Sequence, residues 1–146
     1  MKRSILSIAI TFAICLTSAS MRAAETDQEV EARKAALDLA GAFSNDGFKI
    51  RDGHWSGTVK PNDHILIAVN LYSGNQYWFS VGAPDTATKL TISVYDETGK
   101  QVSTENYENA NKVAAGFLPT SSGQYYVWVG LVDGTESSVC LVYSYK

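Results

Sequence analysis

Hydrophobic and polar residues alternate with a period of two along most of the chain, from residue 48 to residue 145. This alternation is typical of β-strands that bury one face and expose the other. The densest run comes directly after the Gly-Asn pair at 74–75, and its apolar face carries Tyr77, Phe79 and Val81. We expect this run to form the central strand of the fold.

Turn sequences rich in Gly, Asn, Asp and Pro divide the alternating region into about eight strands. The strands are expected around residues 48–51, 55–59, 65–71, 76–81, 90–95, 113–117, 125–131 and 139–145, with the weakly patterned segment 102–107 as an edge strand or a loop. The turn at 60–63 predicts a hairpin between the second and third strands. Short strands at this spacing, with no helices between them, predict an all-β antiparallel sandwich or barrel.

A helix is expected before the strands, within residues 25–46. Thr26 and Glu29 have the spacing of a capping box, in which each side chain bonds the backbone N–H of the other residue. An apolar stripe at helical spacing follows. Its members are Ala32, Ala36, Leu39, Ala40 and Phe43. Because an isolated helix of this length is marginally stable in water, we expect it to pack on the sandwich formed by residues 47–146.

Residues 1–24 have the features of a secretory signal peptide. Lys2 and Arg3 precede an apolar run at 5–16, and small residues follow this run. The run is shorter than the ~20 residues that cross a bilayer, so we expect removal of the segment and no stable membrane insertion afterwards. The sequence therefore predicts a secreted or periplasmic protein.

Charge and cysteine content narrow the class of protein. The formal net charge is −3, and removal of Lys2, Arg3 and Arg22 with the signal peptide would make it −6. No basic cluster remains that could neutralise a row of phosphates, which argues against nucleic acid as a partner. Removal of Cys15 would leave Cys140 alone within an apolar strand, where we expect a buried thiol that acts as a small hydrophobic group.

Three segments resemble the bacterial pre-peptidase C-terminal domain family. Segment 74–81 has the G-x-x-Y-x-F pattern of that family, segment 90–99 ends in D-x-x-G, and segment 122–129 begins with S-G-x-Y. The resemblance extends from about residue 60 to residue 146. It implies a jelly-roll-like sandwich with a non-catalytic, accessory role. Such domains usually follow a secreted hydrolase, whereas a short helix and one hairpin precede this one, so we expect a free-standing module.

No arrangement of residues indicates a catalytic site. His54 and His64 each lie near an aspartate, but the expected hairpin separates them by roughly 16 Å, too far for one metal ion. The segment 53–57 is similar to a nucleophile elbow, but Trp55 stands where that motif needs serine. We therefore expect no enzymatic activity. The alternative is a secreted hydrolase with a carboxylate pair that the sequence does not reveal.

No cofactor is expected. Calcium is the one metal that the carboxylates in the turns could bind. Asp96, Glu97 and Asp133 lie in turns after strands, and they would form a calcium site if these turns met on one rim of the sandwich. The alternative is that the acidic residues simply end strands, which is their usual role in turns. We therefore assign no metal ligand.

Aromatic residues are the best candidates for a binding site. With Tyr77 and Tyr125 facing the core, strand parity places Trp78, Tyr126 and Trp128 on an opposite face. One hypothesis is that Trp78 and Trp128 form a platform on which sugar rings or an extended polymer stack. The alternative, which we favour, is that the apolar stripe of the helix covers both side chains. Their solvent exposure decides between the two.

The predicted function is that of an exported, non-catalytic binding or accessory module. Its partner would be a glycan, another polymer or a protein, and Trp78, Tyr126 and Trp128 are the candidate ligand-binding residues. A further alternative is a structural protein of the cell envelope that engages other proteins through a sheet edge.

Overall fold

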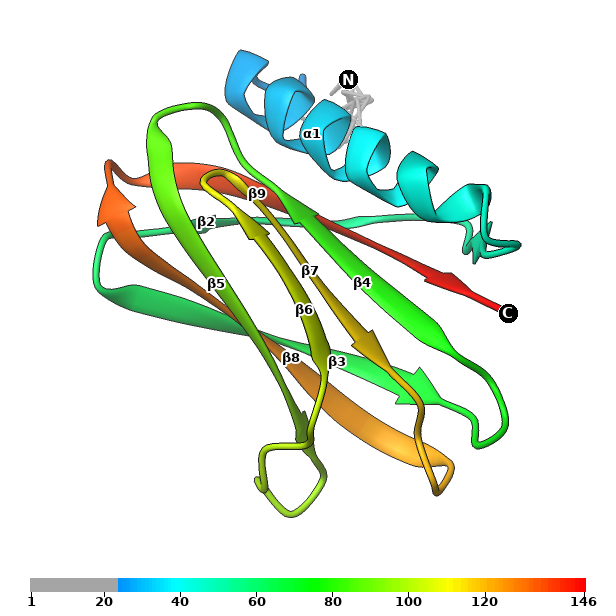
Figure 1. Ribbon diagram of the computed structural model, residues 1–146. Coiled ribbons are helices and arrows are strands. Elements are labelled where there is room, and N and C mark those ends of the chain that lie inside the picture. Colours follow the sequence, from blue (N-terminus) through cyan, green and yellow to red (C-terminus); the bar gives the residue numbers. More distant parts are fainter. Residues whose placement is uncertain (1–23) are drawn as a thin grey trace, which may run out of the picture.

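Two antiparallel β-sheets and one helix make up the computed structural model, which describes residues 24–146 (Figure 1). The predicted signal peptide therefore lies outside the described residues, apart from Ala24. The elements are α1 (Asp27–Ser44), β1 (Lys49–Ile50), β2 (Trp55–Val59), β3 (Asp63–Leu71), β4 (Tyr77–Gly82), β5 (Ala87–Asp96), β6 (Glu105–Asn109), β7 (Lys112–Phe117), β8 (Gly123–Gly134) and β9 (Ser137–Tyr145).

The strands follow a jelly-roll arrangement. The larger sheet has the order β1-β9-β4-β7-β6, with β2 also paired to β9, and the smaller sheet has the order β3-β8-β5. Most consecutive strands therefore lie in different sheets, which is how a jelly roll wraps a chain around its core. Two pairs of consecutive strands depart from this alternation, because β1 and β2 both pair with β9, and β6 pairs with β7, in the larger sheet. The predicted jelly-roll-like sandwich is confirmed, and segment 102–107 contributes to an edge strand.

The predicted hairpin between β2 and β3 is wrong. Residues 55–59 pair with β9 of the larger sheet, whereas residues 63–71 pair with β8 of the smaller one. Asn62, in the connection, has a positive φ of 60°, and its backbone N–H donates to the Leu131 carbonyl oxygen at 2.7 Å. This bond turns the chain from one sheet to the other, so the connection is a corner of the sandwich.

The core lies between the two sheets, and β4 is central to it. Tyr77, Phe79 and Val81 point inwards from β4 and are buried, as the alternation predicts. β4 pairs with β9 on one side and β7 on the other, so the prediction of a central strand is confirmed. The Tyr77 hydroxyl oxygen accepts a hydrogen bond from the backbone N–H of Tyr72 at 2.9 Å, which ties the loop between β3 and β4 to this strand.

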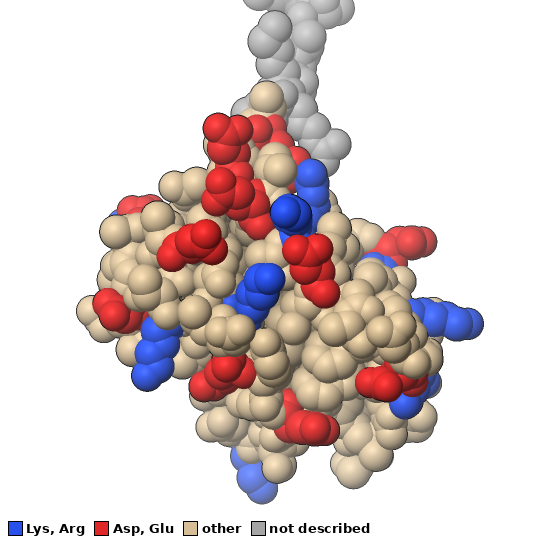
Figure 2. Space-filling view, turned by 45° about the horizontal axis from the view of Figure 1, so that its top comes forward, with Lys and Arg blue, Asp and Glu red and all other residues tan. Residues whose placement is uncertain are grey.

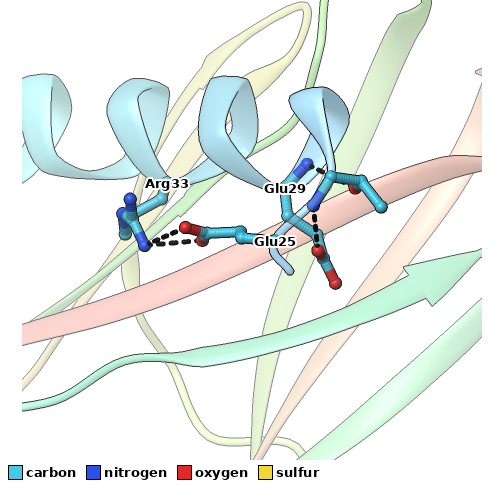
Figure 3. Close-up of polar contacts among 4 residues, drawn as sticks. Glu25, Glu29 and Arg33 are labelled. Atoms are coloured by element: carbon cyan, nitrogen blue, oxygen red, sulfur yellow. Dashed lines mark hydrogen bonds and ion pairs between the residues drawn. The ribbon is translucent and has the colours of Figure 1, made fainter. Parts of the chain in front are cut away.

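The helix begins where the sequence predicts. The backbone N–H of Thr26 donates to Glu29 Oε2 at 2.7 Å, and that of Glu29 donates to Thr26 Oγ1 at 3.2 Å (Figure 3). Both halves of the capping box are therefore present. Arg33 forms an ion pair with Glu25, which holds the chain just before the helix against its second turn.

Small residues let α1 pack closely on the outer face of the larger sheet. Ala32, Ala36 and Ala40 form a buried cluster with Cys140 and Val142 of β9. Figure 1 shows α1 lying along one side of the sandwich, next to β4 and β9. The predicted packing of the helix on the sandwich is thus confirmed. Within the described residues, no helix is both long and apolar enough to cross a membrane.

Candidate binding surface on the smaller sheet

The two candidate tryptophans lie on opposite sides of the sandwich. Trp78 belongs to β4 and points out of the larger sheet, whereas Trp128 belongs to β8 and points out of the smaller sheet. The hypothesis that they form one platform is therefore wrong, and so is the favoured alternative that the helix covers both. Parity tells which side of its own strand a residue occupies, but it does not tell which sheet the strand joins.

Trp78 is covered by the helix. Its ring stacks on that of Phe43, with 4.1 Å between the ring centroids and 9° between the planes. On the sheet side it lies against Gly116, where a Cβ atom would be 2.9 Å from the indole. For Trp78, the prediction that the apolar stripe of the helix covers the side chain is therefore correct.

Trp128 stands on the face that points away from the helix. Its neighbours across the sheet are Leu66 on β3 and Ser93 on β5. Leu66 is 56% exposed, which is high for a large apolar side chain on a sheet. The next pair along this face consists of Tyr126 and Tyr95. Three partly exposed aromatic rings and a leucine thus share one sheet surface that α1 does not cover.

The Trp128 indole is held flat against the sheet. A Cβ atom on Gly130 would lie 2.4 Å from the indole, so the ring extends over this glycine, two residues further along β8. His64 lies opposite Gly130 and stacks beside the indole, with 5.1 Å between centroids and 22° between planes. These two contacts restrict the indole to one orientation before any ligand arrives.

A shallow groove of about 530 Å³ runs along these side chains. Leu66, Tyr95, Tyr126 and Trp128 line one part of it, and the turn at 97–99 lines the other. The volume falls within the ~300–1,000 Å³ that is usual for small-molecule sites.

The turn beside the groove is held by Asp96. Its Oδ1 accepts hydrogen bonds from Thr98 Oγ1 at 2.6 Å, from the Thr98 backbone N–H at 2.9 Å and from the Lys100 backbone N–H at 3.0 Å. The bond from the Thr98 hydroxyl, followed by that from the Lys100 N–H, lowers the pKa of Asp96 below its ordinary value. Asp96 therefore fixes one wall of the groove through its Oδ1.

The central part of the outer face of the smaller sheet carries no Lys, Arg, Asp or Glu side chain. The outward residues are His64, Leu66, Ala68 and Asn70 on β3, Thr91, Ser93 and Tyr95 on β5, and Gln124, Tyr126, Trp128 and Gly130 on β8. By contrast, Figure 2 shows acidic and basic side chains spread over the helix side of the molecule, with acidic groups gathered at its top. The groove is thus mainly aromatic, with the Glu97 carboxylate at its turn side and amide and hydroxyl groups nearby.

Sequence reasoning missed three members of this surface. His64, Leu66 and Tyr95 were not assigned to the aromatic site, because their place beside β8 depends on the strand order. One local signal was present, namely the glycine two residues after Trp128. The same spacing recurs at Trp55 and Gly57, where a Cβ atom would lie 2.1 Å from the ring.

The three carboxylates considered for calcium do not meet. Asp96 pairs with Tyr125 at one end of the β5–β8 ladder, whereas Asp133 pairs with Lys89 at the other. Seven residues of strand separate Asp96 from Lys89, which corresponds to roughly 23 Å. A calcium site made from Asp96, Glu97 and Asp133 is therefore wrong. Within residues 24–146, no group of three or more His, Cys, Asp or Glu side chains is placed to hold a metal ion.

The two histidines lie at different places on the sandwich. His64 stacks on Trp128, whereas His54 lines a separate cavity between the sheets with Asn70. Each histidine thus belongs to a different surface of the sandwich.

Cys140 is a buried free thiol beneath the helix, as the sequence predicts. Burial raises the pKa of this thiol above its ordinary value of 9.0. The folded state therefore favours the protonated thiol, and this contribution to stability is present below pH 9.0 and is lost as the pH rises through the folded-state pKa.

We expect Cys140 in the folded protein to react with iodoacetamide at least about 100-fold more slowly than in urea, because reaction requires the helix to lift from the sheet. We also expect the free energy of unfolding to fall above pH 9.0, and to fall less in Cys140→Ala. Rapid alkylation of the folded protein would show that the helix does not protect this thiol.

Among known proteins, the likeness to this chain is confined to solved structures. No protein-family model matches the chain, and no curated protein sequence matches it, so the resemblance to the pre-peptidase C-terminal domain stays a prediction. Among solved structures, the chain is similar to PliG of Aeromonas hydrophila, a periplasmic lysozyme inhibitor of g-type lysozyme. The two are 13% identical with a TM-score of 0.49, over 64% of this chain and 85% of that chain. A likeness at this level does not bear on function.

Proposed function

We propose that the protein is an exported, non-catalytic module that binds a neutral polysaccharide on the outer face of its smaller sheet. One observation carries the proposal: α1 packs on the outer face of the larger sheet, while on the other side Trp128, Tyr126 and Tyr95 are partly exposed beside the exposed Leu66. An exposed aromatic surface of this kind usually marks a binding site.

The chemistry of this face favours a neutral sugar. A flat indole buries one face of a pyranose ring at little entropic cost, because its own orientation is already fixed by Gly130 and His64. Side-chain amides of Asn70 and Gln124 border the aromatic rings and can bond sugar hydroxyls. An acidic polymer would lack a basic partner here, and arginine, which is common at protein-binding hot spots, does not occur among the outward residues.

The groove does not support glycoside hydrolysis. Hydrolysis of a glycosidic bond generally requires two carboxyl groups on either side of the bond. Glu97 contributes the one carboxyl group among the groove-lining residues, and the neighbouring Asp96 is engaged in the turn. This supports binding without turnover, in line with the accessory role that the resemblance to the pre-peptidase C-terminal domain implies. The export part of the proposal depends on the signal-peptide features of residues 1–24.

We expect Trp128→Ala to weaken binding of neutral oligosaccharides by roughly 30-fold, since truncation of an aromatic hot spot costs about 2 kcal/mol or more. A glycan array that includes neutral and uronic-acid-containing oligosaccharides identifies the ligand, and isothermal titration then gives the dissociation constants. Tyr126→Ala is expected to act in the same direction with a smaller effect.

The matched control is Trp78→Ala, which removes the tryptophan covered by Phe43. This variant should lose stability and keep its affinity for the sugar, because Trp78 faces the helix. Equal loss of binding in both variants, or binding restricted to acidic glycans, would contradict the proposed surface. Absence of glycan binding with capture of a purified protein through Trp128 would favour a protein partner instead.

A further inference from the structure

A second cavity, separate from the aromatic face, lies at the open side between the two sheets. Here β2 and β3 are neighbours in the chain but pair with different strands, so their facing edges leave space between the layers. The cavity has a volume of about 340 Å³, at the lower end of the ~300–1,000 Å³ range of small-molecule sites. Its lining comes from the segment before β2, from β3 and from β9.

Arg51 provides an unpaired positive charge at this cavity. Its guanidinium carbon lies 5.4 Å from the centroid of the Tyr143 ring. Among residues 24–146, the ion pair between Arg33 and Glu25 is the only one, so Arg51 has no carboxylate partner even though Asp52 follows it. A guanidinium stays charged at all physiological pH values and presents a fork of N–H donors that matches a carboxylate.

The position of Arg51 is fixed by the backbone. Its N–H donates to the carbonyl oxygen of Tyr143 at 2.9 Å, which extends the pairing of β1 with β9 by one residue. Stacking on the Tyr143 ring then limits the orientations of the guanidinium. The charge is therefore held at the cavity rather than on a freely moving surface side chain.

The rest of the lining is partly apolar and partly polar, and it includes the carboxylate of Asp52 next to Arg51. Ile67 and Val69 from the smaller sheet and Leu141 from the larger sheet contribute aliphatic surface, and Trp55 contributes an indole. His54 and Asn70 add polar groups. A ligand that fits this cavity has an anionic group that pairs with Arg51 and a flat apolar body that fills the space between the two sheets.

We infer that this cavity binds a small organic carboxylate with an aromatic or similarly flat apolar body. The carboxylate pairs with the Arg51 guanidinium. The apolar body lies against Trp55 and Leu141. This site is distinct from the proposed polysaccharide surface on the outer face of the smaller sheet, and Asn70 of β3 borders both.

The probe for this site is 2-naphthoate, titrated into the ¹⁵N-labelled protein and followed by NMR. We expect a dissociation constant of about 1 mM or tighter. Chemical shifts should change at residues 51–55, 67–70 and 141–143. The neutral isostere 2-naphthamide should bind at least about tenfold more weakly, because it lacks the charge-assisted bonds to the guanidinium.

The matched variants are Arg51→Gln and Lys60→Gln, which remove one positive charge each, at opposite ends of β2. Arg51→Gln should weaken 2-naphthoate binding by about tenfold or more, whereas Lys60→Gln should leave it unchanged, because Lys60 does not line the cavity. Thermal unfolding verifies that both variants fold. Three results would each overturn the inference. The first is that no chemical shift changes at a 2-naphthoate concentration of about ten times the expected dissociation constant. The second is that the shift changes centre on Leu66 and Trp128, and the third is that Arg51→Gln binds 2-naphthoate as tightly as the natural sequence does.

Discussion

Replacement of Gly82 by alanine is expected to lower the free energy of unfolding by about 3 kcal/mol, the upper part of the range for overpacking a close contact. A Cβ atom at this position would lie 2.3 Å from the backbone nitrogen of Ala36 and 2.6 Å from the carbonyl oxygen of Ala32. Both are main-chain atoms of α1, so no side-chain rotation can relieve the clash. The whole helix must move away from β4.

Movement of the helix would also uncover its buried contacts. Cys140 and Val142 of β9 lie beneath α1 and are at most 2% exposed. A urea titration followed by circular dichroism measures the loss of stability, and the reaction of Cys140 with iodoacetamide reports separately on the helix. We expect both the midpoint to fall and the thiol to become reactive, because one steric contact determines both.

Gly41→Ala is the matched control for this experiment. Gly41 lies within α1 on its exposed side, and a Cβ atom there would meet nothing within 4 Å. Because alanine is about 0.8–1.0 kcal/mol better than glycine in a helix interior, this variant should be more stable than the natural sequence. If Gly82→Ala were as stable as Gly41→Ala, the close packing of helix on sheet would be wrong.

Local patterns in the sequence were sufficient to predict the elements. The capping box of Thr26 and Glu29 marks the start of α1, because its two hydrogen bonds involve residues three apart. The alternation of Tyr77, Phe79 and Val81 likewise follows from the pleat of a single strand. Neither prediction needs information about which strands become neighbours.

The division of strands between two sheets could not be predicted from such patterns. The turn at 60–63 has the composition of a hairpin turn, yet it connects strands of different sheets. Its course is set by the long-range bond from Asn62 to Leu131, and no local rule reveals that bond.

The candidate site was affected in the same way. Trp78 and Trp128 have equal parity in their strands, but one meets Phe43 of the helix and the other meets His64. Tyr126 and Trp128 were identified from β8 alone, whereas Leu66 and Tyr95 join them only because β3 and β5 flank that strand. Arg51 gave no signal either, since its environment consists of residues distant in sequence.

Phe79→Ala is expected to destabilise the protein most, by about 4 kcal/mol, because a buried phenylalanine truncated to alanine loses its transfer energy and leaves a cavity. Phe79 is 0% exposed in β4, and its ring centroid lies 5.8 Å from that of Tyr143. Strands pair with β4 on both sides, which limits how far the backbone can collapse into the cavity. Urea unfolding monitored by tryptophan fluorescence gives the value. Leu118→Ala provides the comparison, since Leu118 is 55% exposed and its loss should change stability by less than about 0.5 kcal/mol. Similar effects of the two substitutions would mean that β4 does not run through the centre of the core.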